Sequence, residues 1–363
     1  MNGETPGPAA PRANPLLLGH EAAERRLAGA FAGGRLAHAW LIAGPRGIGK
    51  ATLAYRFARF VLAGGGAGGG GLFAAGPAED LAVDPGEPVF RQVASGGHPD
   101  LLTVERGYDE KQERRRSEIS VEDVRAVGGF LRLTPAAGGW RVVVIDSADE
   151  MNRNAANALL KLLEEPPSRA LLLLVCHAPG QLLPTIRSRC RRLDLSPLPQ
   201  PTLEGLLRRY RPSLPEADAA FLGRLAEGSI GRALALAEEG GAELHGALAD
   251  LLIAMPKPDY AALHALGDRM ARKGGETLFR TLSELLLDWL ARLIRLGSGA
   301  APAELSPGEA AAMRRLLAAS SLDQWLALWE KTARLVAQTD SVYLDRKLVW
   351  LTILLDIEAL ART

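Results

Sequence analysis

The loop GPRGIGKAT, residues 44–52, combines the residue types that bind phosphate. Gly44, Gly49 and Lys50 match the pattern G-x-x-x-x-G-K-[ST], in which backbone N–H groups face phosphate oxygens and the lysine adds positive charge. The pattern expects Ser or Thr after the lysine, because that hydroxyl binds Mg²⁺, whereas this chain has Ala51. Phosphate binding is therefore predicted, and hydrolysis becomes a separate question.

The predicted nucleotide-binding residues belong to this loop and to one acidic residue further along the chain. They are Gly44, Pro45, Gly47, Gly49, Lys50, Ala51, Thr52 and Asp146. Thr52 does have a hydroxyl, but a helical step of about 100° turns it away from the ligand direction. A strand-turn-helix joint with incidental glycines is the alternative. The apolar strand before the loop and the amphipathic helix after it favour phosphate binding.

Asp146 ends the apolar run VVVI and is the residue expected to organise Mg²⁺. In ATPases of this type a Glu follows and orients the attacking water, but this chain has Ser147, which cannot act as a base near neutral pH without help. Asp149 and Glu150 are expected to form a solvated acidic helix start. Two catalytic parts, at residues 51 and 147, are thus altered together, which predicts a chain that does not need to hydrolyse nucleotide.

Alternating apolar runs and helical patterns must position these residues. Five strands are predicted, within residues 38–44, 98–106, 140–151, 170–179 and 183–198, and the first, third and fourth are expected to be buried. Helical patterns separate them, so a mostly parallel sheet covered on both faces is expected. Ser120 and Asp123 predict a capping box for the helix that follows Ser120. Beyond residue 196 the pattern is almost purely helical.

The length of 363 residues predicts two or three domains. We expect a disordered leader (1–14), an α/β nucleotide-binding domain (15–195) with a flexible glycine insert (64–71), a small helical domain (196–255) and a second helical domain (256–363).

Composition excludes several classes of protein. A net charge of +1 gives no global basic field for nucleic acid, and two cysteines, Cys176 and Cys190, are too few for a disulfide framework. A reducing, cytoplasmic setting is the simplest expectation. The N-terminal residues lack the pattern of a signal peptide, and charges interrupt every long apolar run, so no membrane span is predicted.

Three segments together resemble the clamp-loader branch of the AAA+ ATPases: residues 38–58, residues 154–167 (NAANALLKLLEEPP) and residues 183–190 (LPTIRSRC). The resemblance is strong over 15–195 and weaker through the helical remainder. It implies an AAA+ P-loop domain, a helical lid and a helical collar. It also implies membership of a hetero-pentamer with gamma/tau-like motor subunits and a delta-like subunit, which acts on a sliding clamp and primed DNA for bacterial DNA polymerase III.

The same resemblance implies a role for Arg189, within Ser188-Arg189-Cys190, as an arginine finger that reaches a neighbour's nucleotide. The alternative is a basic turn that is solvated or contacts DNA phosphates. His177 and Arg232 occupy the possible sensor positions, but His177 is an unusual choice and Arg232 comes one position later than in active motors. Many relatives bind zinc through four cysteines, whereas residues 60–97 contain none, so no zinc is expected.

The leading hypothesis is a non-motor clamp-loader subunit that scaffolds the pentamer and supplies Arg189 in trans. ATP is a possible cofactor, with Mg²⁺ held weakly or not at all, and the sequence leaves open whether nucleotide is bound. The alternative is an active AAA+ motor subunit or a related remodeller, and Ser147 speaks against it. A small-molecule kinase is disfavoured by the three-domain layout.

Overall fold

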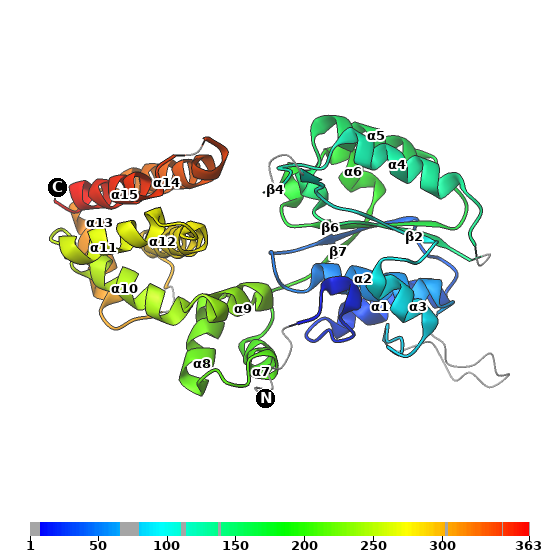
Figure 1. The fold of residues 1–363 in the computed structure, drawn as a ribbon, viewed down its shortest axis with the longest axis horizontal. Coiled ribbons are helices and arrows are strands. Elements are labelled where there is room, and N and C mark those ends of the chain that lie inside the picture. The colour runs from blue at the N-terminus through cyan, green and yellow to red at the C-terminus, as the bar shows by residue number, and fades with distance from the viewer. Residues whose placement is uncertain are drawn as a thin grey trace. The chain divides into compact units, whose positions relative to one another are not determined.

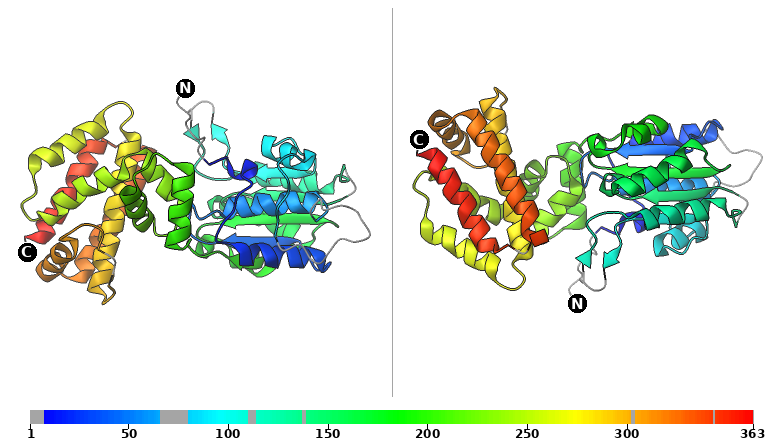
Figure 2. Two further views of the ribbon diagram at one scale, coloured as in Figure 1. Left: turned by 90° about the horizontal axis from the view of Figure 1, so that it is seen from below. Right: turned by 90° about the horizontal axis from the view of Figure 1, so that it is seen from above.

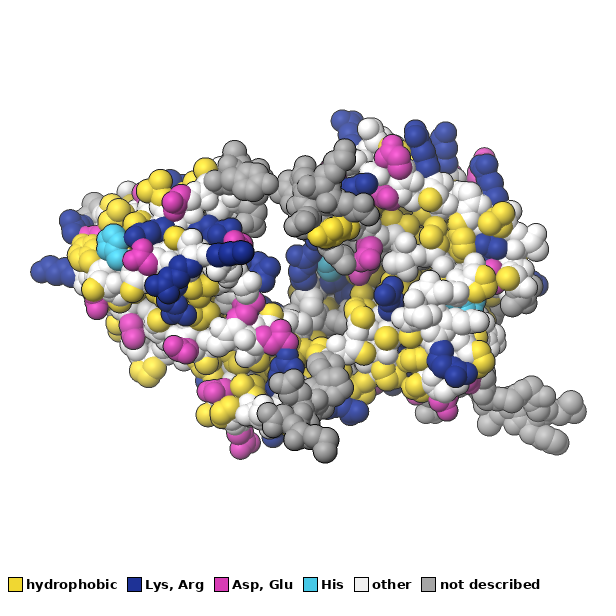
Figure 3. Space-filling view, in the orientation of Figure 1, with side chains coloured by type: hydrophobic (Ala, Val, Ile, Leu, Met, Phe, Trp, Pro, Cys, Tyr) yellow, Lys and Arg dark blue, Asp and Glu magenta, His cyan; other side chains and the backbone are white. Residues whose placement is uncertain are grey.

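A computed structural model of the chain describes residues 8–65, 80–109, 114–136, 139–301, 304–342 and 344–362. Within it the chain forms two compact units. The first comprises Met1–Ser213 with Glu227–Arg232, and the second comprises Leu214–Ala226 with Ala233–Thr363. Acidic and basic side chains are interspersed on the visible face of each unit (Figure 3). No helix in the described part of the chain is long and apolar enough to cross a membrane.

A five-stranded parallel sheet is the centre of the first unit, as expected. Its strands are β1 (Ala39–Ala43), β2 (Leu101–Val104), β5 (Arg141–Ile145), β6 (Ala170–Cys176) and β7 (Arg191–Asp194). They lie in the order β2-β5-β6-β1-β7, and every neighbouring pair is parallel. All residues of β1, β5 and β6 are buried, which is why these strands are continuous apolar runs.

Helices cover both faces of the sheet (Figures 1 and 2). One layer consists of α1 (Glu21–Ala32), α2 (Lys50–Leu62) and α3 (Pro88–Ser95), and the other of α4 (Val121–Arg132), α5 (Arg153–Glu164) and α6 (Pro184–Arg189). Each layer forms its own apolar core with one face of the strands. The predicted capping box at the start of α4 is confirmed, with Ser120 and Asp123 bonded to each other's backbone.

Two loop expectations need correction. Residues 8–14 do not behave as a disordered leader: Pro11–Ala13 form the 3₁₀ helix η1, and Arg59 donates hydrogen bonds to the carbonyls of Arg12 (2.7 Å) and Asn14 (2.8 Å). The buried guanidinium replaces lost water contacts with these carbonyls. The charged run after β2, whose composition predicts an exposed loop, contains a short antiparallel pair, β3 (Tyr108–Asp109) and β4 (Arg114–Arg115). Residues 1–7 and 66–71 of the expected leader and glycine insert lie outside the described residues.

The remaining helices follow β7. They are α7 (Gln200–Tyr210), α8 (Glu216–Leu225), α9 (Ile230–Glu238), α10 (Gly241–Ile253), α11 (Tyr260–Ala271), α12 (Glu276–Gly297), α13 (Glu309–Ala319), α14 (Leu322–Val342) and α15 (Arg346–Ala361). The expected boundary between 255 and 256 falls inside the second unit, because α10 packs on α12 and α13. Trp325 is fully buried and donates to Leu316 O, so it belongs to the core of its own unit.

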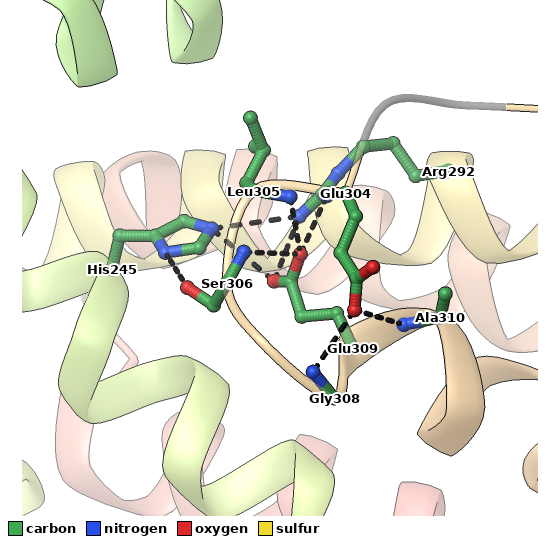
Figure 4. A network of polar contacts seen from close by, with 8 residues as sticks. All are labelled: His245, Arg292, Glu304, Leu305, Ser306, Gly308, Glu309 and Ala310. Carbon is green, nitrogen blue, oxygen red and sulfur yellow. Dashed lines mark hydrogen bonds and ion pairs between the residues drawn. The ribbon is translucent and has the colours of Figure 1, made fainter.

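A buried ionic network fastens three helices of the second unit (Figure 4). Both carboxylate oxygens of Glu309 pair with Arg292, at 2.9 and 3.2 Å, and one lies 3.4 Å from His245 Nε2. The backbone N–H groups of Leu305 and Ser306 also donate to Glu309. Burial alone would raise the pKa of Glu309, but the hydrogen bonds and charge of Arg292 lower it. The carboxylate thus holds the chain before α13 against α12.

Candidate functional site: a phosphate loop beside a serine–histidine pair

The loop between β1 and α2 has a backbone that only glycine accepts at its first position. Gly44 has φ +150°, and a Cβ there would lie 2.5 Å from Leu195 O. Gly49, with φ +102°, immediately precedes the first residue of α2. The loop therefore ends at a helix N-terminus, where free N–H groups and the helix dipole favour an anion.

Lys50 is folded back onto its own loop. Its side chain is only 3% exposed, and Nζ donates to Gly44 O at 2.6 Å and to Pro45 O. Burial lowers the pKa of Lys50 to about 8, against the attraction of Asp149 and Asp146. A buried ammonium of this kind is costly without an anionic partner, so the loop is suited to accept one.

The end of β5 lies two strands from the loop, at the same edge of the sheet. Burial raises the pKa of Asp146, with Glu105 and Glu150 adding to the effect. Ser147 has φ +65°, and its Oγ lies 3.0 Å from His177 Nε2 at the end of β6. Burial and the charge of Lys50 lower the pKa of His177 to about 4, so the imidazole is neutral at physiological pH.

Asp149 and Glu150 differ from the expected solvated helix start. Asp149 accepts hydrogen bonds from the backbone N–H groups of His177 (2.9 Å) and Ala178 (3.0 Å). Burial would raise the pKa of Asp149, but these hydrogen bonds lower it. Glu150 pairs with Arg46 of the loop at 2.9 Å and with Arg106 at 2.8 Å. Both carboxylates thus already have hydrogen-bond or ion-pair partners within this chain.

The turn before α9 rests on the outside of the phosphate loop, within the first unit. Ser229 Oγ donates to Arg46 O at 2.9 Å, and Gly231 N donates to Gly47 O at 2.9 Å. Gly47 has φ +77°, and a Cβ there would collide with Ser229 Oγ. The backbone N–H of Arg232 donates to Ser229 Oγ at 3.2 Å, which brings this expected sensor position to the loop. Sequence reasoning missed Ser229, although its place in GSIGR, three residues before Arg232, was a usable signal.

The loop fits phosphate better than it fits Mg²⁺. Its glycine backbone and Lys50 provide N–H groups and charge, whereas Ala51 has no hydroxyl and Thr52 is 7% exposed within α2. Across the described ranges, no group of three or more His, Cys, Asp or Glu side chains could hold a metal ion. The arrangement can bind an anion, but it offers Mg²⁺ one hydroxyl fewer than the full pattern would.

Arg189 lies apart from this edge. It is the last residue of α6, in the layer opposite α2 (Figure 1). Its Nη2 is 2.8 Å from Glu164 Oε1, Nη1 donates to Thr185 O at 3.0 Å, and the side chain is 36% exposed. The fold therefore groups the loop, Asp146, His177 and the turn that begins α9, and presents Arg189 separately.

Comparison with known proteins relates the chain to replication subunits. A family model described as "DNA polymerase III, delta subunit" matches residues 19–199. DNA polymerase III subunit delta′ of Escherichia coli is 32% identical over 269 residues, which cover 74% of each chain. Subunit delta′ of Pseudomonas aeruginosa is 40% identical over 197 residues, 53% of each chain.

Another DNA polymerase III subunit and a solved structure also match the chain. DNA polymerase III subunit tau of Escherichia coli is 29% identical over 290 residues, 77% of this chain and 42% of tau. The match thus spans about half, or less, of the Pseudomonas delta′ and tau chains. Among solved structures, a gamma subunit-related protein of Thermotoga maritima is 19% identical. The match covers 93% of this chain and 99% of that protein, with a TM-score of 0.38.

Proposed function

The chain belongs to the family of DNA polymerase III delta-prime subunits, and from that membership we propose that it is a non-motor subunit of a sliding-clamp loader. In this role it scaffolds a pentamer with gamma/tau-like motor subunits and a delta-like subunit, and acts on the clamp and primed DNA in the cytoplasm. Its own catalytic contribution is Arg189, offered to the nucleotide of a neighbouring subunit.

The single observation that supports a non-motor role best is the Ser147–His177 hydrogen bond of 3.0 Å at the acidic strand end. In a motor subunit the water-activating base would be a carboxylate directly after Asp146. Ser147 supplies none, Asp149 is bonded to backbone N–H groups, and Glu150 is paired with two arginines. With Ala51 beside Lys50, the chain has lost both a magnesium ligand and a base, so turnover at its own site is not expected.

The phosphate loop itself is retained, and we propose that it binds nucleotide phosphate without hydrolysis. Gly44, Gly47, Gly49 and Lys50 would hold the phosphates, and bound nucleotide would supply the anion that the buried Lys50 ammonium lacks. Equilibrium binding of ADP in the presence of EDTA tests this, because the proposed contacts need no Mg²⁺. Absence of binding at millimolar ADP would reduce the loop to a structural joint.

The proposed role of Arg189 rests on general phosphoryl-transfer chemistry. A guanidinium presents two N–H groups to phosphate oxygens in a fixed fork and cannot lose its charge at physiological pH. Placed against a neighbour's ATP, Arg189 would stabilise charge on the transferred phosphoryl group, an effect worth about 10³–10⁵ in rate in well-studied GTPases. The side chain is exposed enough to meet a partner.

Reconstitution tests the proposed function. Candidate motor and delta-like subunits, a sliding clamp and primed DNA are combined with and without this chain, and loaded clamps are counted. We expect loading to require the chain and to survive Lys50→Ala. Loading that proceeds equally well without the chain would contradict the proposal.

A further inference from the structure

Arg189 and Glu164 form an ion pair whose role the proposed function does not explain. The Nη2 of Arg189 lies 2.8 Å from Glu164 Oε1, and the Nη1 donates to Thr185 O at 3.0 Å. Two different nitrogens of one guanidinium are therefore held, one by α5 and one by its own helix α6. The side chain is fixed at its tip although it is partly exposed.

Glu164 and Arg189 both lie at the ends of helices that are packed into the apolar core. Glu164 is the last residue of α5 and follows Leu163, which is 2% exposed. Arg189 ends α6, where Ile186 is fully buried in the same apolar core as Leu163. Helices α5 and α6 pack together, so the distance between the two side chains is set by the core beneath them.

The placement of Glu164 is unfavourable without its partner. A carboxylate at a helix C-terminus faces the negative end of the helix dipole, whereas a cation there is stabilised. The chain has two acids in this place, Glu164 and Glu165, and Arg189 pairs with the first. Because Glu164 is 49% exposed and Arg189 is 36% exposed, the pair contributes little to folding stability. Its effect is on the orientation of the guanidinium.

We propose that Glu164 is the positioning residue for Arg189, holding the guanidinium in the orientation that meets a neighbour's nucleotide. Arginine has four rotatable side-chain bonds, and a free side chain must lose that freedom when it binds. Fixing the fork in advance removes this loss from the catalytic step, which is the usual benefit of preorganisation. The inference rests on the proposed role of Arg189 in trans.

The test is a mutant cycle in the complete reconstituted loader, with DNA-stimulated ATP turnover as the readout. Five variants of this chain are compared: Glu164→Ala, Glu164→Gln, Arg189→Ala, the double variant of Glu164→Ala with Arg189→Ala, and Glu165→Ala as the matched control. We expect Glu164→Ala to lower kcat about threefold to tenfold with KM for ATP unchanged, and Glu165→Ala to leave both unchanged. Glu164→Gln, which keeps an acceptor oxygen, should recover part of the loss.

The cycle also separates positioning from a merely structural effect. If Glu164 acts through Arg189, the double variant is no slower than Arg189→Ala alone. Two outcomes would overturn the inference and leave the proposed function intact. In the first, the losses of turnover from Glu164→Ala and Arg189→Ala multiply in the double variant. In the second, Arg189→Ala slows turnover, whereas Glu164→Ala leaves it as fast as in wild type or faster. An Arg189→Ala loader with normal turnover would overturn the proposed function itself, and the inference with it.

Discussion

Ser147 Oγ and His177 Nε2 lie 3.0 Å apart where two neighbouring parallel strands, β5 and β6, end. Ser147 stands where a motor subunit would have its water-activating carboxylate, and His177 stands at a possible sensor position. The hydrogen bond joins these two residues. Because the pKa of His177 is lowered to about 4, mainly by burial and the charge of Lys50, the pair is neutral at physiological pH. An imidazole with so low a pKa is a weak base towards water, and the neutral pair does not compensate the charge of Lys50, so the site favours binding over turnover.

The isolated chain should have no steady ATPase activity. The physical reason is the absence of a hydroxyl at Ala51 combined with Ser147 in place of a carboxylate. Phosphate release is measured from purified chain with ATP and Mg²⁺, with and without primed DNA. Turnover that disappears in Lys50→Ala would show that the chain is a motor after all.

Lys50 should make folding stability rise with pH in alkaline solution. Burial lowers its folded pKa from 10.5 to about 8, so between these pH values the unfolded chain binds more protons and the free energy of unfolding increases with pH. The difference of about 2.5 pKa units corresponds to about 3 kcal/mol, an order-of-magnitude figure. Below pH 8 this cost is fully present, and above pH 10.5 it is gone.

Urea unfolding of wild type and Lys50→Met from pH 7 to pH 10.5 checks this. The stability advantage of Lys50→Met should shrink across the range, whereas Lys161→Met, at an exposed position of α5, should stay parallel to wild type. Parallel curves for Lys50→Met and wild type would mean that Lys50 titrates normally.

Gly47→Ala should disturb the turn that begins α9. The added Cβ would collide with Ser229 Oγ, in addition to the strain of φ +77°. Gly34 is the matched control, because it has φ +63° and no atom within 4 Å of an added Cβ. Gly34→Ala should cost about 1 kcal/mol from backbone strain, and Gly47→Ala roughly 1–3 kcal/mol more from overpacking. Equal losses of unfolding free energy in the two variants, measured with urea, would show that the turn shifts to accept the Cβ without cost.

Glu309→Gln should destabilise the second unit strongly. The substitution leaves the buried Arg292 without its charge partner, and breaking a buried pair in this way costs about 3–5 kcal/mol. Glu304→Gln, on an exposed carboxylate that accepts from Gly308 N at 2.9 Å, is the control and should cost about 1 kcal/mol or less. Hydrogen exchange of α10, α12 and α13 reports the effect locally. Protection that is the same in both variants would refute this account of the network.

The sequence predicted those features that depend on local pattern. The five strands and the capping box of Ser120 follow from apolar runs and from residues three apart, and both are confirmed. Fold class was predictable for the same reason, because regular alternation of strand and helix leaves few arrangements of a parallel sheet.

Long-range pairings were not predictable in this way. Asp149 reaches backbone 28 residues away, and Arg59 binds carbonyls of a leader that composition made look disordered. In both cases a polar group satisfies a buried partner that only the tertiary structure brings near. Residues 255 and 256, where Pro and charge suggested a linker, lie inside one compact unit, because α10 packs on the helices that follow it.

The central claim is that this chain serves chemistry across a subunit interface and not at its own loop. The direct test is DNA-stimulated ATP turnover of the reconstituted loader with three variants: Arg189→Ala, Lys50→Ala and the charge-matched control Arg192→Ala, whose side chain pairs with Asp194 on β7. We predict a several-fold or larger loss for Arg189→Ala only, with assembly unchanged by size-exclusion chromatography. A loss in Lys50→Ala beside normal turnover in Arg189→Ala would contradict the account.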